Sequence, residues 1–203
     1  MSTTRSPGQR AGLTYAAVLA AARELLSEGG LPALSMRSLA HRLGVAPNAL
    51  YSHVGSKTAL LDDLLDDLLA LVAAPNPDDG EPTAGLAELM TSTYDVLTAH
   101  PDMVPLYLSR QGARGSNAVR LGQVTDALLT RAGATGPRGT EARRVLIVFA
   151  IGSAAFTTAP TPHSDQPLSA AEARRSYVQG LRWLLNGITN TRDSAQPIPP
   201  ASH

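Results

Sequence analysis

Helical periodicity interrupted by Gly, Pro and Asn is the feature that most limits how this chain can fold. Apolar residues recur every three or four positions between these breaks, and no segment shows the strict alternation of a β-strand. Aromatic residues make up only 4% of the 203 residues, so Ala and Leu must fill most of the interior. We therefore expect an all-α fold with helices at about 14–27, 35–43, 47–54, 57–73, 83–99, 101–109, 117–132, 138–158 and 169–188.

A proline-rich loop over residues 75–82 divides the predicted helices into two groups. We expect a flexible arm over residues 1–11, an N-terminal three-helix, helix-turn-helix domain over 12–72, a C-terminal helical bundle over 73–190 and a disordered tail over 191–203. The chain has no cysteine, which excludes disulfides, thiolate metal sites and a cysteine nucleophile. The longest apolar run and the polar N-terminus predict neither a membrane span nor a signal peptide, so we expect a cytoplasmic protein.

Charge is distributed unevenly although the net charge is zero. Residues 1–60 hold six basic and two acidic side chains, whereas the remainder holds 11 basic and 15 acidic ones. A basic head on an acidic body is typical of a nucleic-acid-binding domain joined to a domain that does not bind nucleic acid.

The segment from residue 35 to about residue 54 has the layout of a helix-turn-helix motif. Ser35 can cap the first helix, Gly44 provides the turn, and Pro47 suits the first position of the second helix. The pattern leaves one polar surface on that second helix, made of Pro47, Asn48, Tyr51, Ser52 and His53. Such groups suit base edges and backbone oxygens of DNA, although an ordinary helical corner with a polar face has the same pattern.

The stretch Leu13–Leu69 closely resembles the DNA-binding domain of the TetR family of repressors. The resemblance is clearest in LGV-x4-LY-x-HV-x2-K-x-ALLD, which begins at Leu43 and is similar to the tetracycline repressor subgroup. Two positions depart from the family pattern: Ala46 stands where many relatives have a capping Ser, and Ser52 where the most similar ones have a large aromatic residue.

The resemblance implies a set of DNA contacts and a mode of action. Phosphate contacts are implied for Lys57, the only lysine of the chain, and for Tyr51, and contacts at the start of the preceding helix for Ser35, Met36 and Arg37. Base or groove contacts are implied for the recognition helix, at Pro47, Asn48, Ala49, Ser52 and His53. The expected function is that of a ligand-responsive transcriptional regulator, a repressor that binds a palindromic double-stranded DNA operator as a homodimer and is released by a small-molecule effector.

Two further sites are expected in the body. Large side chains among many alanines can line an effector pocket, and the candidates are Met90, Tyr94, His100, Met103, Tyr107, Phe149, Phe156 and Trp183. Ordinary core packing explains the same residues, and His100 can equally end a helix. The last two long helices are expected to form the dimer interface, as in the family, with a seam of Val145, Leu146, Phe149, Gly152, Leu181, Leu184, Leu185 and Ile188.

Other functions are weaker alternatives. Asp62, Asp63, Asp66 and Asp67 could hold a divalent cation, but we expect them to form a solvated helix face, and we expect no metal and no cofactor. No nucleophile-elbow motif supports catalysis, so an enzyme is not expected. The competing function is a helical interaction or adaptor protein whose head no longer binds an operator.

Overall fold

The computed structural model describes residues 13–110, 114–159 and 168–190, and every regular element within these ranges is helical, as predicted. The head contains α1 (Tyr15–Ala33), α2 (Met36–Leu43), α3 (Pro47–Leu50) and α4 (Lys57–Leu69). The body contains α5 (Pro82–Ala99), the short 3-10 helix η1 (Pro101–Met103), α6 (Val104–Arg110), α7 (Ser116–Arg131), α8 (Gly136–Thr158) and α9 (Ala170–Asn190). The arm at 1–11 and the tail at 191–203 lie outside the described residues.

The predicted helices are found close to their predicted positions, and three changes of boundary lie outside α3. α1 continues past Gly29 and bends at Gly30, whose φ of 65° suits a residue without a Cβ, before one more turn to Ala33. α4 ends at Leu69 rather than near residue 73. The predicted helix over 101–109 is a 3-10 turn that leads directly into α6.

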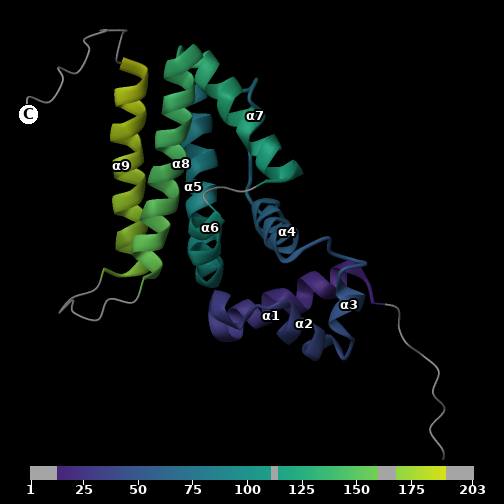
Figure 1. The fold of residues 1–203 in the computed structure, drawn as a ribbon. Helices are drawn as coiled ribbons and strands as arrows, with labels where there is room; N and C mark the ends of the chain where they lie inside the picture. The colour runs from purple at the N-terminus through teal and green to yellow at the C-terminus, as the bar shows by residue number, and fades with distance from the viewer. Residues whose placement is uncertain (1–12, 111–113, 160–167, 191–203) are drawn as a thin grey trace, which may run out of the picture.

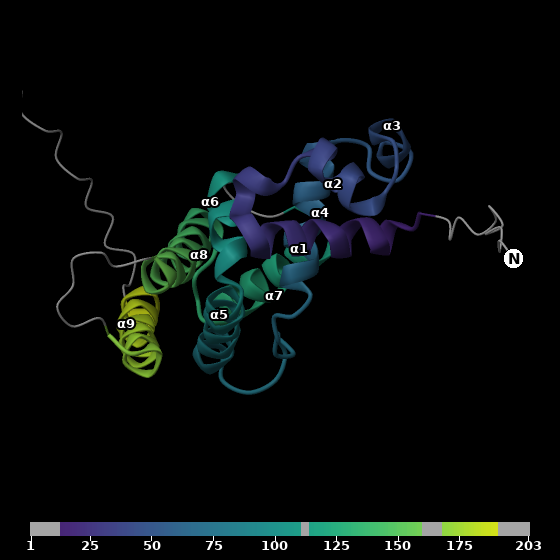
Figure 2. The ribbon, with the colours of Figure 1, turned by 90° about the horizontal axis from the view of Figure 1, so that it is seen from below.

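α5, α8 and α9 run side by side through the body, α7 crosses them at an angle, and α1, α2 and α3 of the head lie together at one end of the molecule (Figure 1). Seen from below, α3 lies at the end of the molecule farthest from α9 (Figure 2). α4 connects the two parts, since it contacts α1 in the head and α5, α6 and α7 in the body. Buried leucines of α4, such as Leu64, Leu65 and Leu68, belong to one continuous apolar core that extends in both directions.

An aromatic stack holds the three long body helices together. The ring of Tyr177 on α9 lies 4.1 Å from that of Tyr94 on α5 and 5.3 Å from that of Phe149 on α8, measured between centroids. The Tyr177 hydroxyl donates to the Met90 carbonyl at 2.8 Å, and the Tyr94 hydroxyl lies 3.0 Å from the hydroxyl of Thr157. Burial raises the pKa of Tyr177 above its usual range, so its hydroxyl remains a donor.

The carboxylates of α4 form the polar part of the contact between head and body. Asp62 accepts two hydrogen bonds from the Arg110 guanidinium at the end of α6, at 2.9 and 3.0 Å. Asp66 accepts from the backbone N–H groups of Asn117 and Ala118, both at 3.0 Å, and so caps the start of α7. Asp67 pairs with Arg23 of α1.

The expectation of a solvated acidic face on α4 is therefore wrong. Sequence periodicity placed these carboxylates beside one another, but the cations and N–H groups that they bind come from α1, α6 and α7, more than 40 residues away. In the described part of the chain, no group of three or more His, Cys, Asp or Glu side chains is arranged to hold a metal ion.

Replacing Asp66 by Ala should lower the free energy of unfolding by about 1–2 kcal/mol, because the first turn of α7 loses its cap. Urea titration followed by far-UV circular dichroism measures this change. Asp78→Ala, in the exposed loop before α5, is the control and should change stability by less than about 0.5 kcal/mol. Equal effects of the two substitutions would contradict the capping role of Asp66.

Candidate nucleic-acid interface and ligand cavity

Local hydrogen bonds fix the start of α2 and the turn that follows it. The Ser35 hydroxyl accepts from the Ser38 N–H at 3.0 Å, and the Ser38 hydroxyl accepts from the Ser35 N–H at 2.9 Å, which makes a reciprocal capping box. α2 ends at Gly44, whose φ of 65° lies in the left-handed region that glycine adopts without strain. This turn sets the angle at which α3 leaves α2.

α3 is shorter than predicted: it ends at Leu50 instead of Val54. The Ser52 hydroxyl donates to the Ala49 carbonyl at 2.7 Å, and the His53 N–H donates to the Leu50 carbonyl, so the chain tightens into a turn. α3 begins at Pro47, and its N-cap residue Ala46 provides no side-chain hydrogen bond. Burial of Leu50 and Val54 holds this short helix and its turn against the head.

α3 and the turn after it expose a run of candidate DNA-contacting residues that only the buried Leu50 interrupts. All six lie exposed: Pro47, Asn48, Ala49, Tyr51, Ser52 and His53. Arg37 and Lys57 are exposed as well, at the first turns of α2 and α4. Ser35 and Met36 differ, because Ser35 is engaged in the capping box and the half-buried Met36 packs against the core.

The basic residues of the head fall into two groups. Arg42 donates to Glu28 at 2.8 Å and to Glu24 at 3.2 Å, and its guanidinium lowers the pKa of the Glu28 carboxyl. Arg23 is paired with Asp67. Within the described residues, Arg37 of α2 and Lys57 of α4 form no ion pair, so their positive charges remain uncompensated. Lys57 also lies at the positive end of the α4 dipole.

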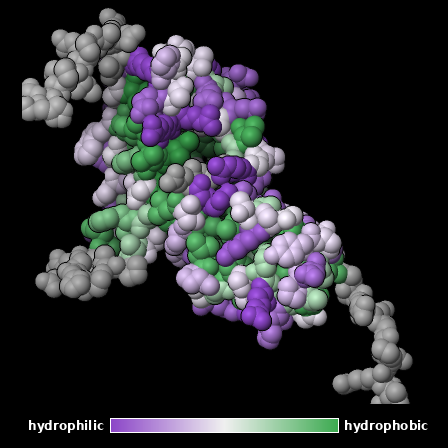
Figure 3. Space-filling model, in the orientation of Figure 1, coloured by the Kyte–Doolittle hydropathy of each residue, from purple (hydrophilic) through white to green (hydrophobic). Residues whose placement is uncertain are grey.

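The body contains a cavity of about 720 Å³ between α5, α6, α7 and α8, which Leu69 of α4 also lines. This volume lies in the range of small-molecule sites. In the space-filling view, apolar side chains gather in a hollow of the body that hydrophilic ones surround (Figure 3). Most lining residues are apolar, and the polar ones are Thr93, Tyr107, Thr125, Thr140, Arg143 and Arg144.

Only some of the residues predicted to line the pocket lie at the cavity. Met90 and Tyr107 line the cavity. Tyr94 and Phe149 belong to the aromatic stack, and Met103 is buried in the core. Phe156 and Trp183 were predicted wrongly as pocket residues, because their side chains are 78% and 69% exposed on the outside of the bundle.

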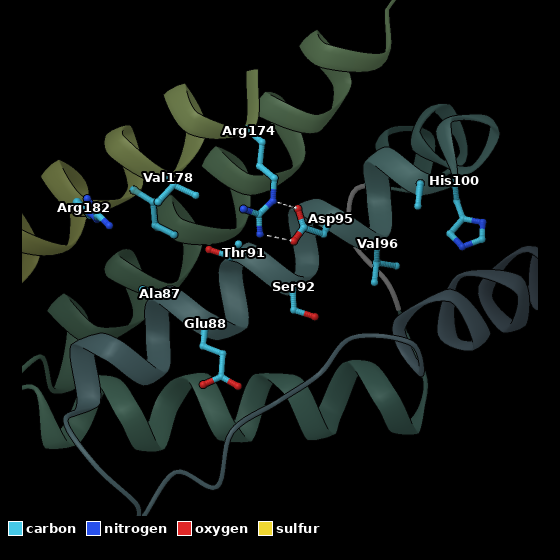
Figure 4. Close-up of a pocket in the computed structure, with 12 residues that line it drawn as sticks. Ala87, Glu88, Thr91, Ser92, Asp95, Val96, His100, Arg174, Val178 and Arg182 are labelled. Atoms are coloured by element: carbon cyan, nitrogen blue, oxygen red, sulfur yellow. Dashed lines mark hydrogen bonds and ion pairs between the residues drawn. The ribbon is translucent and has the colours of Figure 1, made fainter. Parts of the chain in front are cut away.

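His100 borders a second hollow, which lies open on the surface between α5 and α9 (Figure 4). Arg174 of α9 reaches across it and donates two hydrogen bonds of 2.7 Å to Asp95 of α5, whereas His100 lies apart from this pair (Figure 4). This ion pair bridges the two helices. The apolar cavity is therefore the better candidate for a ligand site.

The predicted dimer seam is only partly exposed. Leu146, Leu181 and Leu185 are buried in the core of the single chain, so the prediction of these three as interface residues is wrong. Phe149, Leu184 and Ile188 are half-buried, whereas Val145 and Gly152 are exposed. The exposed apolar side chains of α8 and α9 are instead Val145, Val148, Phe156 and Trp183.

Sequence reasoning missed the walls of the cavity that α7 and α8 supply. Leu121 and Thr125 of α7 and Ile147 of α8 were not singled out, nor were the adjacent Arg143 and Arg144. Two consecutive arginines directly before the apolar run of this helix were a usable signal. No described helix is long and apolar enough to span a membrane.

The sequence of the head is similar to that of a known protein family. Residues 18–64 match the family described as "Bacterial regulatory proteins, tetR family". An HTH-type transcriptional regulator of Saccharopolyspora erythraea is 35% identical over 121 residues, which cover 60% of this chain and 51% of that protein. The chain thus spans only about half the length of this curated relative.

Two solved structures share the fold over nearly their whole length. A TetR variant from Acinetobacter baumannii AYE, in complex with minocycline, has 28% identity and a TM-score of 0.70, with 87% of this chain and 96% of that chain covered. BioQ with its double-stranded DNA operator has 25% identity and a TM-score of 0.69, with 88% and 99% covered. The head of the chain is thus similar to the DNA-binding domain of the tetR family of bacterial regulatory proteins, and the chain as a whole shares the fold of these two structures.

Proposed function

We propose that this protein is a ligand-responsive transcriptional regulator, a repressor that binds a palindromic operator as a homodimer in the cytoplasm. The observation that carries the proposal is the exposed polar surface of α3 together with two exposed and uncompensated cations, Arg37 and Lys57, in the helices that precede and follow α3. Phosphate contacts from these cations would position the head, and Asn48 and His53 would read base edges. BioQ, a relative in fold, is described with a DNA operator.

The cavity is linked to the same head through α4. Tyr107 and Leu108 of α6 line it just before Arg110, which binds Asp62. Ala118 of α7 lines it too, and its N–H binds Asp66. A ligand that moves α6 or α7 would therefore move α4, whose first residue is Lys57. To weaken operator binding a hundredfold, the ligand must favour the released state by ~2.7 kcal/mol.

The exposed side of α8 and the neighbouring part of α9 are the proposed dimer interface. Val145, Val148, Gly152 and Phe156 recur every three or four residues and so share one face of α8, and Val148 and Gly152 also line the rim that this face shares with the cavity. α9 packs against α8 and adds the exposed Trp183. A large apolar surface of this kind is typical of a protein–protein contact.

Lys57→Ala should weaken binding to every duplex by a similar factor, because the lysine would contact phosphate and not bases. The slope of log affinity against log salt should become shallower by about one per subunit. Fluorescence anisotropy, with a random duplex and a duplex selected by the wild-type protein, measures both quantities. Lys57→Arg is the control and should keep the slope; a changed sequence preference at unchanged slope would refute the role.

Asn48→Ala and His53→Ala should each reduce affinity for the selected duplex by ~1–3 kcal/mol and leave random-DNA affinity almost unchanged, because base contacts are lost. The same anisotropy titrations test this expectation. Gln123→Ala, at an exposed position of α7, provides the control and should change neither affinity. Equal losses on both duplexes would place Asn48 and His53 among the phosphate contacts. If the wild-type protein selects no duplex at all, the adaptor function replaces the proposed one.

Phe156→Arg should convert the dimer into a folded monomer, because the side chain is exposed in the single chain but would carry an unpaired charge into the interface. Light scattering coupled to size-exclusion chromatography measures the change. Specific operator binding should be lost with it, since two heads spaced by ~34–36 Å must act together. Val119→Arg, at an exposed apolar position of α7, should remain dimeric. A Phe156→Arg dimer with wild-type affinity would exclude this face.

A further inference from the structure

We infer that the cavity binds an anionic amphiphile, a molecule with an apolar body and one carboxylate-like group, and that Arg144 receives the anion. The inference specifies the class of effector and rests on the proposed function only for the regulatory meaning of binding. Binding itself is a property of the body and can be measured without DNA.

The charge of the lining is the first argument. Among the described residues, Arg143 and Arg144 are the only charged ones that line the cavity, and no Asp or Glu does. Arg143 donates to Asp126 at 2.7 Å. Its guanidinium also lies directly over Gly122, where an added Cβ would come within 2.5 Å of it, so Arg143 is held against α7. Its charge is therefore already balanced.

Arg144 is the uncompensated charge. Within the described residues it forms no ion pair and no hydrogen bond, and it is exposed at the edge of the cavity. A planar guanidinium can bind a carboxylate with two parallel hydrogen bonds. A cationic ligand would find no carboxylate in the described lining and would be repelled by this arginine.

The hydroxyl groups of the lining are the second argument. Thr93, Thr125 and Thr140 donate to carbonyls of their own helices, at 2.9, 2.7 and 3.3 Å, and so turn their donors away from a ligand. Tyr107 is only 8% exposed, and its hydroxyl has no hydrogen-bond partner among the described residues, unlike those of Tyr94 and Tyr177. Burial raises the pKa of Tyr107, which keeps this hydroxyl protonated and able to donate to an oxygen of the ligand.

The rest of the wall sets the nature of the ligand body. Leu89 and Met90 of α5, Leu121 of α7, and Ile147 and Ile151 of α8 are all apolar. A polyhydroxylated ligand would leave most of its own polar groups without partners there, which costs free energy for each group. A ligand with an apolar body would contact the apolar wall, one polar oxygen would accept a hydrogen bond from Tyr107, and its anion would pair with Arg144.

A pair of fluorescent probes that differ by one sulfonate tests this inference. 8-Anilinonaphthalene-1-sulfonate carries the anion, and N-phenyl-1-naphthylamine is the same molecule without it. The wild-type protein, in the absence of DNA, should bind the sulfonate more tightly. Arg144→Gln should weaken binding of the sulfonate about fivefold to tenfold and change that of the neutral probe less than about twofold. Arg144→Lys should restore part of the difference.

Two further variants locate the probes and control for charge. Arg120→Gln removes an exposed arginine from the opposite side of α7 and should leave both affinities unchanged. Ile147→Trp fills the cavity and should abolish binding of both probes while circular dichroism shows an intact fold. Equal affinity of the wild-type protein for the two probes, an equal loss of both in Arg144→Gln, or sulfonate binding that survives Ile147→Trp would each overturn the inference.

The outcome is separable from that of the proposed function. If operator binding persists but the affinity for the sulfonate does not depend on Arg144, the anion site is refuted and the proposed regulatory function is not. If Arg144→Gln weakens sulfonate binding but the wild-type protein selects no duplex, the anion site is supported and the DNA-binding function is refuted.

Discussion

Carboxylates on α4 hold the head and the body of this protein together. Asp62 and Asp66 are four residues apart on one helix face, where like charges repel unless other groups compensate them. Arg110 compensates Asp62, and the first N–H groups of α7 compensate Asp66. A helix N-terminus presents unpaired donors and a positive dipole end, so it suits a carboxylate as well as a cation does. The apolar core of α4 is thus joined by polar contacts whose geometry depends on where α6 ends and α7 begins.

Charge pairing within the chain also limits which arginines can bind an external anion. Arg42 and Arg23 are paired within the head, and Arg143 and Arg174 within the body, so each is bound to a carboxylate of the chain. Arg37, Lys57 and Arg144 have no such partner among the described residues. Exposed pairs contribute little to stability, but they determine which cations are left to attract an external anion. Of these cations, Arg37 and Lys57 lie in the first turns of α2 and α4, and Arg144 lies at the edge of the cavity. Arg120, Arg175 and Arg182 also form no ion pair with a carboxylate among the described residues and lie exposed on the body.

Large aromatic side chains fill the contacts of α8 with α5 and α9, whereas among the described residues no such side chain fills its contact with α7. The stack of Tyr94, Tyr177 and Phe149 packs α5, α8 and α9 closely. The opposite side of α8 faces α7, where Gly122, Thr125 and Ala118 are small, and the space beside them is the cavity. Large side chains close one interface of α8, and small ones leave the other open.

The sequence by itself determined the helices and the helix-turn-helix motif. Local signals sufficed for these: the Ser35 cap, the left-handed Gly44, Pro47 at the start of α3, and the spacing of apolar residues all act within a few positions. The exposure of Asn48, Tyr51 and His53 followed from the same periodicity. Even here a local competitor was missed, because the Ser52 hydroxyl bonds to the chain and shortens α3.

Only the tertiary structure decided what the body residues do. Leu146, Leu181 and Leu185 look like an interface in the sequence, but α8 and α9 turn them toward α5 and toward each other, and Phe156 and Trp183 face outward instead. The roles of Asp62, Asp66 and Arg144 depend on partners, present or lacking, on other helices. Periodicity specifies the face of a helix on which a residue lies, whereas the neighbour of that face depends on how all the helices pack.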